Sequence, residues 1–430
     1  MLNVPIAQKI LWWLGAAGFN VPASKSIGQH PGKIQPVQKT GDIGKVKTQF
    51  FEFNDAKKPL QLRVGGTLPQ FTLAYETYGR MNSNQSNVIL LFHAMTGSQH
   101  AAGINISVPG LDGRWTDETH EGWWHSFIGP GKALDTRKFC VICANYLGGC
   151  YGSTGPASIN PATGKTWGPA FPVLRMSDIV DSQIKLLDHL GVKKLHAVLG
   201  ASLGGFLSQM LATRYPDRVK NVVCIGTGAE TTTYQRIINF EQITAIEGDP
   251  NFKGGAYYSG DRPNIGLALA RRIAHKTFVS LEALRERARN EVVSHKPPHG
   301  WYEMNHPVES YMLRQGEKFV RRFDANSYLR ILDAWQWFDL VAESGAKDLT
   351  EAFERCQQQE WLVFSIDSDL MFHPQEQAKL VSILKKAHVP VMWLTAHSDK
   401  GHDSFLLEPR LYTPHLHHVL GDGKRERKKS

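Results

Sequence analysis

Short apolar runs and longer, helically spaced patterns alternate along most of the chain. The short runs are rich in β-branched and aromatic residues and predict strands at residues 71–78, 87–92, 139–144, 195–199, 222–226, 361–366 and 389–394. Between two of them, residues 177–190 carry apolar side chains at helical spacing, namely Val180, Ile184, Leu187 and Leu190. Strands that alternate with helices predict a mostly parallel sheet covered by helices on both faces.

One long region breaks this alternation. Residues from about 231 to 353 show helical patterns and many charges, but no convincing strand. A stretch of about 120 residues is too long for a simple connection in a compact fold. We therefore predict a helical lid over residues 231–354, inserted into an α/β core formed by residues 46–230 and 355–420.

Basic residues concentrate at the two ends of the chain. The formal net charge is +9, yet residues 1–40 hold four lysines and no acidic residue, and residues 424–429 are strongly basic. We interpret residues 1–45 as a flexible extension and residues 421–430 as a basic tail, both solvated. This distribution argues against a folded surface for nucleic acid. A positive field still favours, weakly, an anionic co-substrate such as a CoA thioester.

The sequence gives little sign of a membrane, a metal or a disulfide framework. No apolar run reaches the roughly 18 residues of a membrane span, and the run at residues 10–19 makes only a poor signal peptide. Cysteines number five, and the spaced pair Cys140 and Cys143 lies in a predicted strand, where positions three apart face opposite sides. We expect a reduced, cytoplasmic chain with no bound cofactor or metal.

The first candidate for chemistry is the segment Gly200-Ala-Ser-Leu-Gly204, followed by Gly205. It comes directly after the predicted strand 195–199 and before a helical run at 206–215. A GxSxG segment between strand and helix is typical of a nucleophile elbow, a tight turn that holds a serine above the sheet. Ser202 is therefore the candidate nucleophile.

A serine hydroxyl needs a base to accept its proton. In the α/β-hydrolase fold the order along the chain is serine, then an acid, then a histidine near the end. Asp369 follows the strand 361–366 and His402 follows the strand 389–394, while Asp367 and His397 compete for the same roles. A metal site at the late histidines is disfavoured because they lack Cys or Glu partners at useful spacing; these are His415, His417 and His418.

Acyl transfer also needs donors for the oxyanion. The backbone N–H of Leu203 is one candidate, because this residue follows the nucleophile at a helix start. The second donor should come from the loop after the strand 87–92, where we choose the N–H of Met95.

At this point the chain resembles a known family, the homoserine O-acyltransferases of methionine biosynthesis. The resemblance runs from about Leu73 to Leu407. Its most distinctive stretches are Tyr75-Glu-Thr-Tyr-Gly79, His93-Ala-Met-Thr-Gly97, His100-Ala-Ala-Gly103, Ile128-Gly-Pro-Gly-Lys132, Leu147-Gly-Gly-Cys-Tyr-Gly-Ser-Thr-Gly-Pro156, Asn160-Pro-Ala-Thr-Gly164, Val308-Glu-Ser-Tyr311, Gln315-Gly316 and Arg322-Phe-Asp-Ala-Asn-Ser-Tyr328. The first 45 residues and the tail match nothing, and residues 285–289 lack an aromatic residue expected in the lid.

The resemblance implies a role for individual residues. Asp369 matches the family's triad acid, and His402, in Gly401-His-Asp-Ser-Phe405, matches its base. Arg271, with Arg272 beside it as a possible substitute, matches the residue that binds the amino-acid carboxylate, for which a guanidinium is well shaped. Asp403 matches the residue that holds the substrate ammonium. We also expect a homodimer formed through the lid.

The acyl donor is predicted from one position. Family members that use succinyl-CoA typically carry an arginine two residues after the triad acid, and here that position is Met371. Methionine offers an apolar wall and no charge, so a succinyl carboxylate would lose water without gaining a partner. The sequence therefore predicts acetyl-CoA as co-substrate and homoserine as acceptor.

Other functions remain open from the sequence. Within the same class these are transfer to serine and transfer from succinyl-CoA. An ester hydrolase would use water as the acceptor, and a catalytically inactive binding module on the same fold is disfavoured by the complete triad order.

Overall fold

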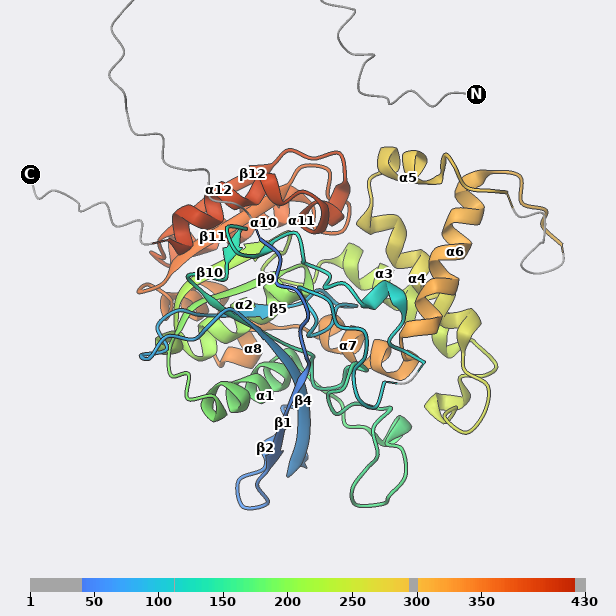
Figure 1. The fold of residues 1–430 in the computed structure, drawn as a ribbon, viewed down its shortest axis with the longest axis horizontal. Helices are drawn as coiled ribbons and strands as arrows, with labels where there is room; N and C mark the ends of the chain where they lie inside the picture. Colours follow the sequence, from blue (N-terminus) through green and yellow to red (C-terminus); the bar gives the residue numbers. More distant parts are fainter. Residues whose placement is uncertain (1–40, 112, 294–300, 422–430) are drawn as a thin grey trace, which may run out of the picture. The chain divides into compact units, whose positions relative to one another are not determined.

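The computed structural model describes residues 41–111, 113–293 and 301–421, so the predicted N-terminal extension and the basic tail lie almost wholly outside the described residues. Its centre is an eight-stranded sheet (Figure 1). In spatial order the strands are β1 (Gln49–Asn54), β4 (Gln70–Tyr78), β8 (Cys140–Ala144), β5 (Val88–Phe92), β9 (Leu195–Ala201), β10 (Val219–Ile225), β11 (Glu360–Ile366) and β12 (Val391–Ala396). The β1–β4 and β4–β8 pairs are antiparallel, and all the other pairs are parallel.

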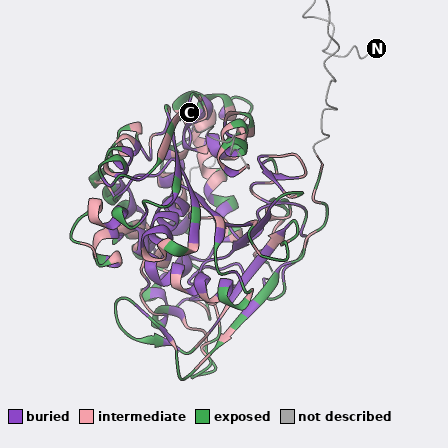
Figure 2. Cartoon of the chain, turned by 90° about the vertical axis from the view of Figure 1, so that its left-hand side faces the viewer, coloured by how far each residue is buried: buried purple, intermediate pink, exposed green. Residues whose placement is uncertain are grey.

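Alternate residues of each strand face two separate hydrophobic layers, as the two-residue period of a strand requires. Leu90 and Val198 point into one layer, which also takes in side chains of α1 (Met176–His189) and α2 (Leu203–Arg214). The neighbouring Leu91 and Leu199 point into the other layer, which is closed by α12 (Pro409–Leu420). Both faces of the sheet are therefore covered, and its inner strands are buried, whereas the edge strands β1 and β12 are partly exposed (Figure 2).

The segment between β10 and β11 is helical throughout its described part. It contains α3 (Thr233–Glu247), α4 (Asn264–Phe278), α5 (Leu281–Ala288), α6 (Pro307–Arg322), α7 (Ala325–Gln336), α8 (Leu340–Ser344) and α9 (Leu349–Glu354). Helix α4 packs against both α3 and α6, to one side of the sheet (Figure 1). Helix α8 packs against α2, and α9 against α10 (Pro374–Lys386), so these two helices lie on the core. The division into lid and core at residues 231–354 stays a prediction.

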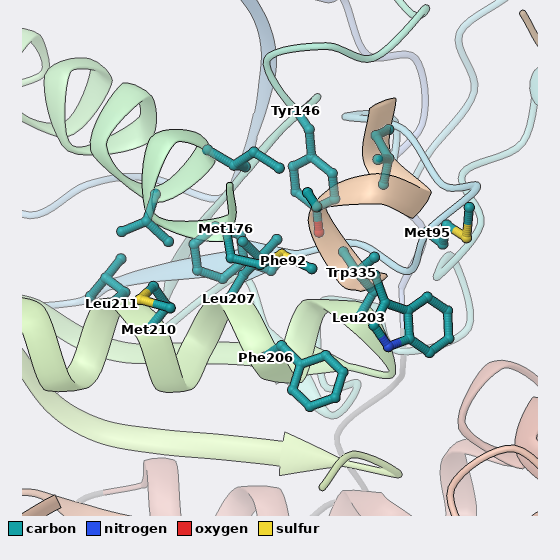
Figure 3. Close-up of a cluster of buried hydrophobic side chains, with 14 of the residues drawn as sticks. Phe92, Met95, Tyr146, Met176, Leu203, Phe206, Leu207, Met210, Leu211 and Trp335 are labelled. Carbon is teal, nitrogen blue, oxygen red and sulfur yellow. The ribbon is translucent and has the colours of Figure 1, made fainter. Parts of the chain in front are cut away.

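One stacked pair of rings ties this insertion to the core beside the elbow. Trp335 of α7 lies parallel to Phe372, with ring centroids 5.7 Å apart, and Phe206 of α2 packs against both. Figure 3 shows Phe206, Leu203 and Trp335 at the start of α2 in this hydrophobic cluster.

The seven predicted strands and the helices at 177–190 and 206–215 are confirmed, with ends that differ by up to three residues. The structure also contains strands that the sequence did not predict: the edge strand β1 and the short pairs β2 (Leu60–Gln61) with β3 (Thr67–Leu68) and β6 (Ile128–Gly129) with β7 (Leu134–Asp135). Phe50 in β1 is 37% exposed while Phe51 is buried, so adjacent aromatic residues hide the alternation that marks a strand.

Candidate active site

Ser202 lies at a strained turn between β9 and α2. Its backbone has φ 57° and ψ −129°, a conformation that non-glycine residues rarely adopt and that marks functional sites. A Cβ on Gly200 would lie 2.0 Å from the carbonyl oxygen of Gly204, and one on Gly204 would lie 2.4 Å from that of Phe92. The turn therefore needs glycine at both positions, and the loop after β5 lies directly against the start of α2.

Asp369 and His402 are joined by a short hydrogen bond in the buried interior. The Nδ1 atom of His402 lies 2.6 Å from Oδ2 of Asp369, and both side chains are almost wholly buried. The other carboxylate oxygen accepts the backbone N–H groups of Met371 and Phe372, each at 2.8 Å. Asp369 is thus held as an acceptor, so Nδ1 of His402 carries the hydrogen and Nε2 is left as the basic nitrogen.

The Nε2 atom of His402 is buried and makes no hydrogen bond to any residue in the described ranges. Burial lowers the pKa of this histidine, but the negative charges of Asp369, Asp403 and Glu376 outweigh burial and leave the pKa above its ordinary value. A buried base whose free nitrogen has no hydrogen-bond partner among the described residues is placed to take a proton from a ligand or a nucleophile.

Ser202 and the Asp369–His402 pair lie close together around Gly226, which directly follows β10. The N–H of Ser202 donates to the carbonyl of Ile225 at 2.9 Å. The next residue, Gly226, has φ 53°, and a Cβ there would lie 3.2 Å from Oδ2 of Asp369 and 3.3 Å from Nδ1 of His402. Three segments distant in sequence therefore converge at the carboxyl ends of parallel strands.

The competing pair lies elsewhere. Asp367 accepts a hydrogen bond from Nδ1 of His397 at 2.9 Å, and the His397 side chain is 83% exposed. Such an open pair is poorly suited to hold an imidazole in one orientation. Geometry therefore favours Asp369 with His402, the choice that the family resemblance implied.

The two predicted oxyanion donors flank the elbow. Leu203 is the first residue of α2, and the first N–H groups of a helix have no acceptor within the helix. Met95 lies in a turn closed by a bond from the N–H of Gly97 to the carbonyl of Ala94 at 2.9 Å. Tyr146 supports this loop by donating its hydroxyl to the carbonyl of His93. Their roles stay predictions.

Arg271 reaches the site from the inner side of α4. Its guanidinium lies 5.6 Å from the ring of Phe278, which in turn lies 6.0 Å from the ring of His402. Arg271 lines a cavity of about 240 Å³, together with residues of the loop after β5. Arg272, the possible substitute, is half-buried and does not line this cavity, and its Nε has no partner in the described part of the chain.

Asp403 and Met371 have partners that the sequence did not reveal. Asp403 is paired with Arg287 of α5, whose Nη1 lies 3.4 Å from Oδ2, although burial raises the pKa of the carboxyl. Met371 is 1% exposed, and its sulfur accepts a hydrogen bond from Thr277 of α4 at 3.4 Å. Arg287 lies in the segment noted for its missing aromatic residue, and no sequence signal pointed to this pairing.

A half-buried carboxyl near the Asp369–His402 pair was also not foreseen from the sequence. Glu376, at the start of α10, accepts hydrogen bonds from the side chain of Gln235 and the N–H of His373. Burial raises the pKa of Glu376 to about 7. Its position becomes visible only when α3 and α10 pack together.

The other candidates raised by the sequence are placed away from this site. All five cysteines are free and buried, and burial raises the pKa of Cys140 to about 11. His417 bonds the carbonyl of Lys132 at 2.8 Å, and the ring of His415 packs on Phe364. Within the described residues there is no group of three His, Cys, Asp or Glu side chains that could hold a metal ion, and no helix is long and apolar enough to cross a membrane.

Comparisons with known proteins decide the family. A family model described as the alpha/beta hydrolase fold matches residues 87–409. A homoserine O-acetyltransferase from Caulobacter vibrioides is 40% identical over 375 residues, which is 86% of this chain and 94% of that protein. This chain belongs to the homoserine O-acyltransferase family. The predicted family and fold are thereby confirmed, and the chain is an enzyme of this family.

Other members and neighbours leave the finer chemistry open. A homoserine O-succinyltransferase from Acidithiobacillus ferrooxidans is 39% identical over 388 residues, covering 90% of this chain and 98% of that protein. Among solved structures, a homoserine O-acetyltransferase from Bacillus anthracis has a TM-score of 0.76 and 28% identity, covering 87% of this chain and 98% of that one. Esterase E22 has a TM-score of 0.77 and 25% identity, and the match covers 87% of this chain and 100% of the esterase chain. The homoserine O-acyltransferase fold thus hosts more than one acyl chemistry.

Proposed function

We propose that this enzyme transfers an acetyl group from acetyl-CoA to the side-chain hydroxyl of L-homoserine, a reaction of methionine biosynthesis, through an acyl group carried on Ser202. One observation carries the proposal. Asp369 and His402, bonded at 2.6 Å, leave a buried Nε2 that has no partner among the described residues, near the strained elbow of Ser202, in a chain of the homoserine O-acyltransferase family.

The first half-reaction follows from these groups. The hydroxyl oxygen of Ser202 attacks the thioester carbonyl carbon while Nε2 of His402 takes its proton. The N–H groups of Met95 and Leu203 stabilise the oxyanion that forms. The C–S bond then breaks, and the leaving thiolate takes the proton back from His402, which leaves an acyl-serine and free CoA.

The second half-reaction reverses these roles. The acceptor hydroxyl attacks the acyl-serine carbonyl and passes its proton to His402. The C–O bond to Ser202 then breaks, and the leaving serine oxygen takes that proton back from His402, which releases the acylated acceptor and regenerates the free enzyme. Arg271 binds the acceptor carboxylate, because a planar guanidinium matches it in a bidentate way. Asp403 binds the acceptor ammonium. Asp369 accepts the Nδ1 hydrogen of His402 and stabilises the imidazolium that forms.

Replacement of Ser202 tests this mechanism. Ser202→Ala removes one oxygen, so the thermal unfolding temperature should stay near that of the wild type while CoA release falls to background. Wild-type enzyme quenched after mixing with acetyl-CoA alone should carry an acetyl mass on the peptide containing Ser202. Residual activity in Ser202→Ala, free of wild-type contamination, would show that another group is the nucleophile.

Ester hydrolysis is the second candidate, favoured by the similarity to esterase E22. A thiol-release assay separates the two functions by crossing acetyl-, succinyl- and propionyl-CoA with homoserine and serine. Release of CoA that depends on homoserine supports transfer, whereas steady release without any amino acid indicates a hydrolase. Preference for serine or for succinyl-CoA would correct the acceptor or the donor.

We also propose a cytoplasmic homodimer that associates through the lid. Large apolar side chains on α3 and α4 are between 39% and 61% exposed, and they form the support for this proposal: Tyr234, Ile237, Phe240, Ile265 and Leu269. Clustered exposed apolar residues mark interaction surfaces. Sedimentation analysis should give twice the chain mass for the wild type and the chain mass for Phe240→Glu.

A further inference from the structure

The cavity beside the loop after β5 contains a second arginine, to which the sequence alone assigned no role. Arg322 is the last residue of α6, and it lines the same cavity of about 240 Å³ as Arg271. The two guanidiniums lie over the ring of Phe319, each with its central carbon 5.1 Å from the ring centroid. Because α4 packs against α6, the two side chains reach the cavity from adjacent helices.

Neither guanidinium has a carboxylate partner. Within the described part of the chain, no Asp or Glu oxygen lies within 4.0 Å of Arg271 or Arg322. Among the described residues, Arg322 donates from Nη1 to the hydroxyl of Tyr151 at 2.9 Å and to the carbonyl of Thr96 at 3.3 Å, both neutral acceptors. Two carboxylates, Glu118 and Glu121, also line the cavity, but Glu118 pairs with Lys318 and Glu121 lies near His125 rather than on a guanidinium. The two guanidiniums, which are partly removed from water, are therefore left to bind an anion.

Tyr151 adds a third donor to the same cavity. Its oxygen accepts the hydrogen bond from Arg322, so the hydroxyl hydrogen remains available for another acceptor. Burial raises the pKa of Tyr151 to about 12, so the hydroxyl keeps its hydrogen at neutral pH. Two guanidiniums and one hydroxyl converge as donors.

We propose that Arg322 and Arg271 together bind the carboxylate of the acceptor amino acid, with the hydroxyl of Tyr151 as a further donor, so that Arg322 selects acceptors that carry a carboxylate. The inference rests on the proposed transfer to homoserine and assigns it a second specificity residue. Arg322 also bonds Thr96, in the loop that carries the predicted oxyanion donor Met95. Binding of the acceptor carboxylate is thus linked to the position of that loop.

The test compares an acceptor that has the carboxylate with one that lacks it. With acetyl-CoA as donor, kcat/KM is measured for L-homoserine and for L-homoserinamide, in which a neutral amide replaces the carboxylate. Arg322→Gln should lower kcat/KM for homoserine by about ten- to a hundredfold, the usual range for a charge-assisted bond, and change that for homoserinamide by less than about threefold. Tyr151→Phe should also lower kcat/KM for homoserine, but by less than Arg322→Gln does.

The adjacent Arg321 supplies a matched control, because its side chain is exposed on the same turn of α6. Arg321→Gln should leave kcat/KM unchanged for both homoserine and homoserinamide. Arg322→Lys keeps a charge and shows whether the planar fork is needed, and its unfolding temperature reports whether the helix end is intact.

The outcomes separate this inference from the proposed function. An equal loss for both acceptors would overturn the carboxylate role and make Arg322 a support for the loop. A rise confined to the KM for acetyl-CoA would also overturn it and place the CoA phosphates there. If the wild type releases no CoA in response to homoserine, the proposed function itself fails.

Discussion

His402 Nδ1 and Asp369 Oδ2 lie 2.6 Å apart although 33 residues separate them in the chain. Asp369 receives two backbone N–H bonds on its other oxygen, so its orientation does not depend on the histidine. The ring of His402 is also stacked on Phe372, at a centroid distance of 5.4 Å. The imidazole is therefore held in one tautomer and one orientation before any substrate arrives.

Asp369→Asn should reduce kcat by about 10³- to 10⁴-fold, because the amide can donate to Nδ1 and so favour the tautomer in which Nε2 is protonated. Steady-state release of CoA with homoserine as acceptor measures this loss in kcat. The variant should bind acetyl-CoA with an affinity near that of the wild type. A loss of less than about tenfold would mean that Asp369 does not set the tautomer.

The pH dependence of kcat/KM should follow His402. The base must be neutral to accept a proton, and its pKa is raised above 6.5, so activity should rise with pH through a value above 6.5. Glu376 contributes to this rise, so Glu376→Gln should move the acidic limb to lower pH. If the wild type and Glu376→Gln show the same midpoint, the negative charge of Glu376 does not raise the pKa of His402.

Gly226→Ala should strongly impair catalysis while the sheet stays folded. The added Cβ would lie 3.2 Å from Asp369 and 3.3 Å from His402, and the positive φ of 53° disfavours a side chain. A displacement of the imidazole of even 1 Å costs about 10²-fold in rate. Gly254→Ala is a control, because it shares a positive φ of 62° but meets nothing within 4 Å.

Arg287→Gln should lower the KM for homoserine by about three- to tenfold. Arg287 pairs with Asp403 at 3.4 Å, so it competes with the substrate ammonium for that carboxylate. The KM for acetyl-CoA should not change. Arg285→Gln, which removes an exposed arginine paired only with Glu282 in the described residues, is the control. An unchanged KM for homoserine would argue that Asp403 does not bind the ammonium.

The wild type should prefer acetyl-CoA over succinyl-CoA in kcat/KM by at least about tenfold. Met371 is buried with its sulfur bonded to Thr277, so this residue itself offers a succinyl carboxylate no charged partner. Met371→Arg should move the ratio toward succinyl-CoA by about ten- to a hundredfold, with stability checked by thermal unfolding. Met371→Leu should leave the ratio unchanged. If the wild type shows comparable kcat/KM values for acetyl-CoA and succinyl-CoA, Met371 does not select the acyl donor.

The local patterns of the sequence were sufficient for seven of the eight strands of the sheet and for the elbow. Strand residues 197–199 alternate between two buried faces, and Gly200 is required by a contact within a single turn, so short segments carry this information. The same reasoning named Asp369 and His402 as candidates, since residues that follow parallel strands meet at one edge. Local pattern could not separate them from Asp367 and His397, and the family resemblance made that choice.

Only the tertiary structure decided which charges share the site. Arg322, Arg287 and Glu376 come from α6, α5 and α10, and their side chains approach the cavity or the Asp369–His402 pair because the helices between β10 and β11 pack against one another and against the core. Helical periodicity states which face of a helix is apolar, but it does not state which helix lies opposite. Charge pairing across helices depends on that packing, and so do the partner of Asp403 and the two arginines that face one anion site.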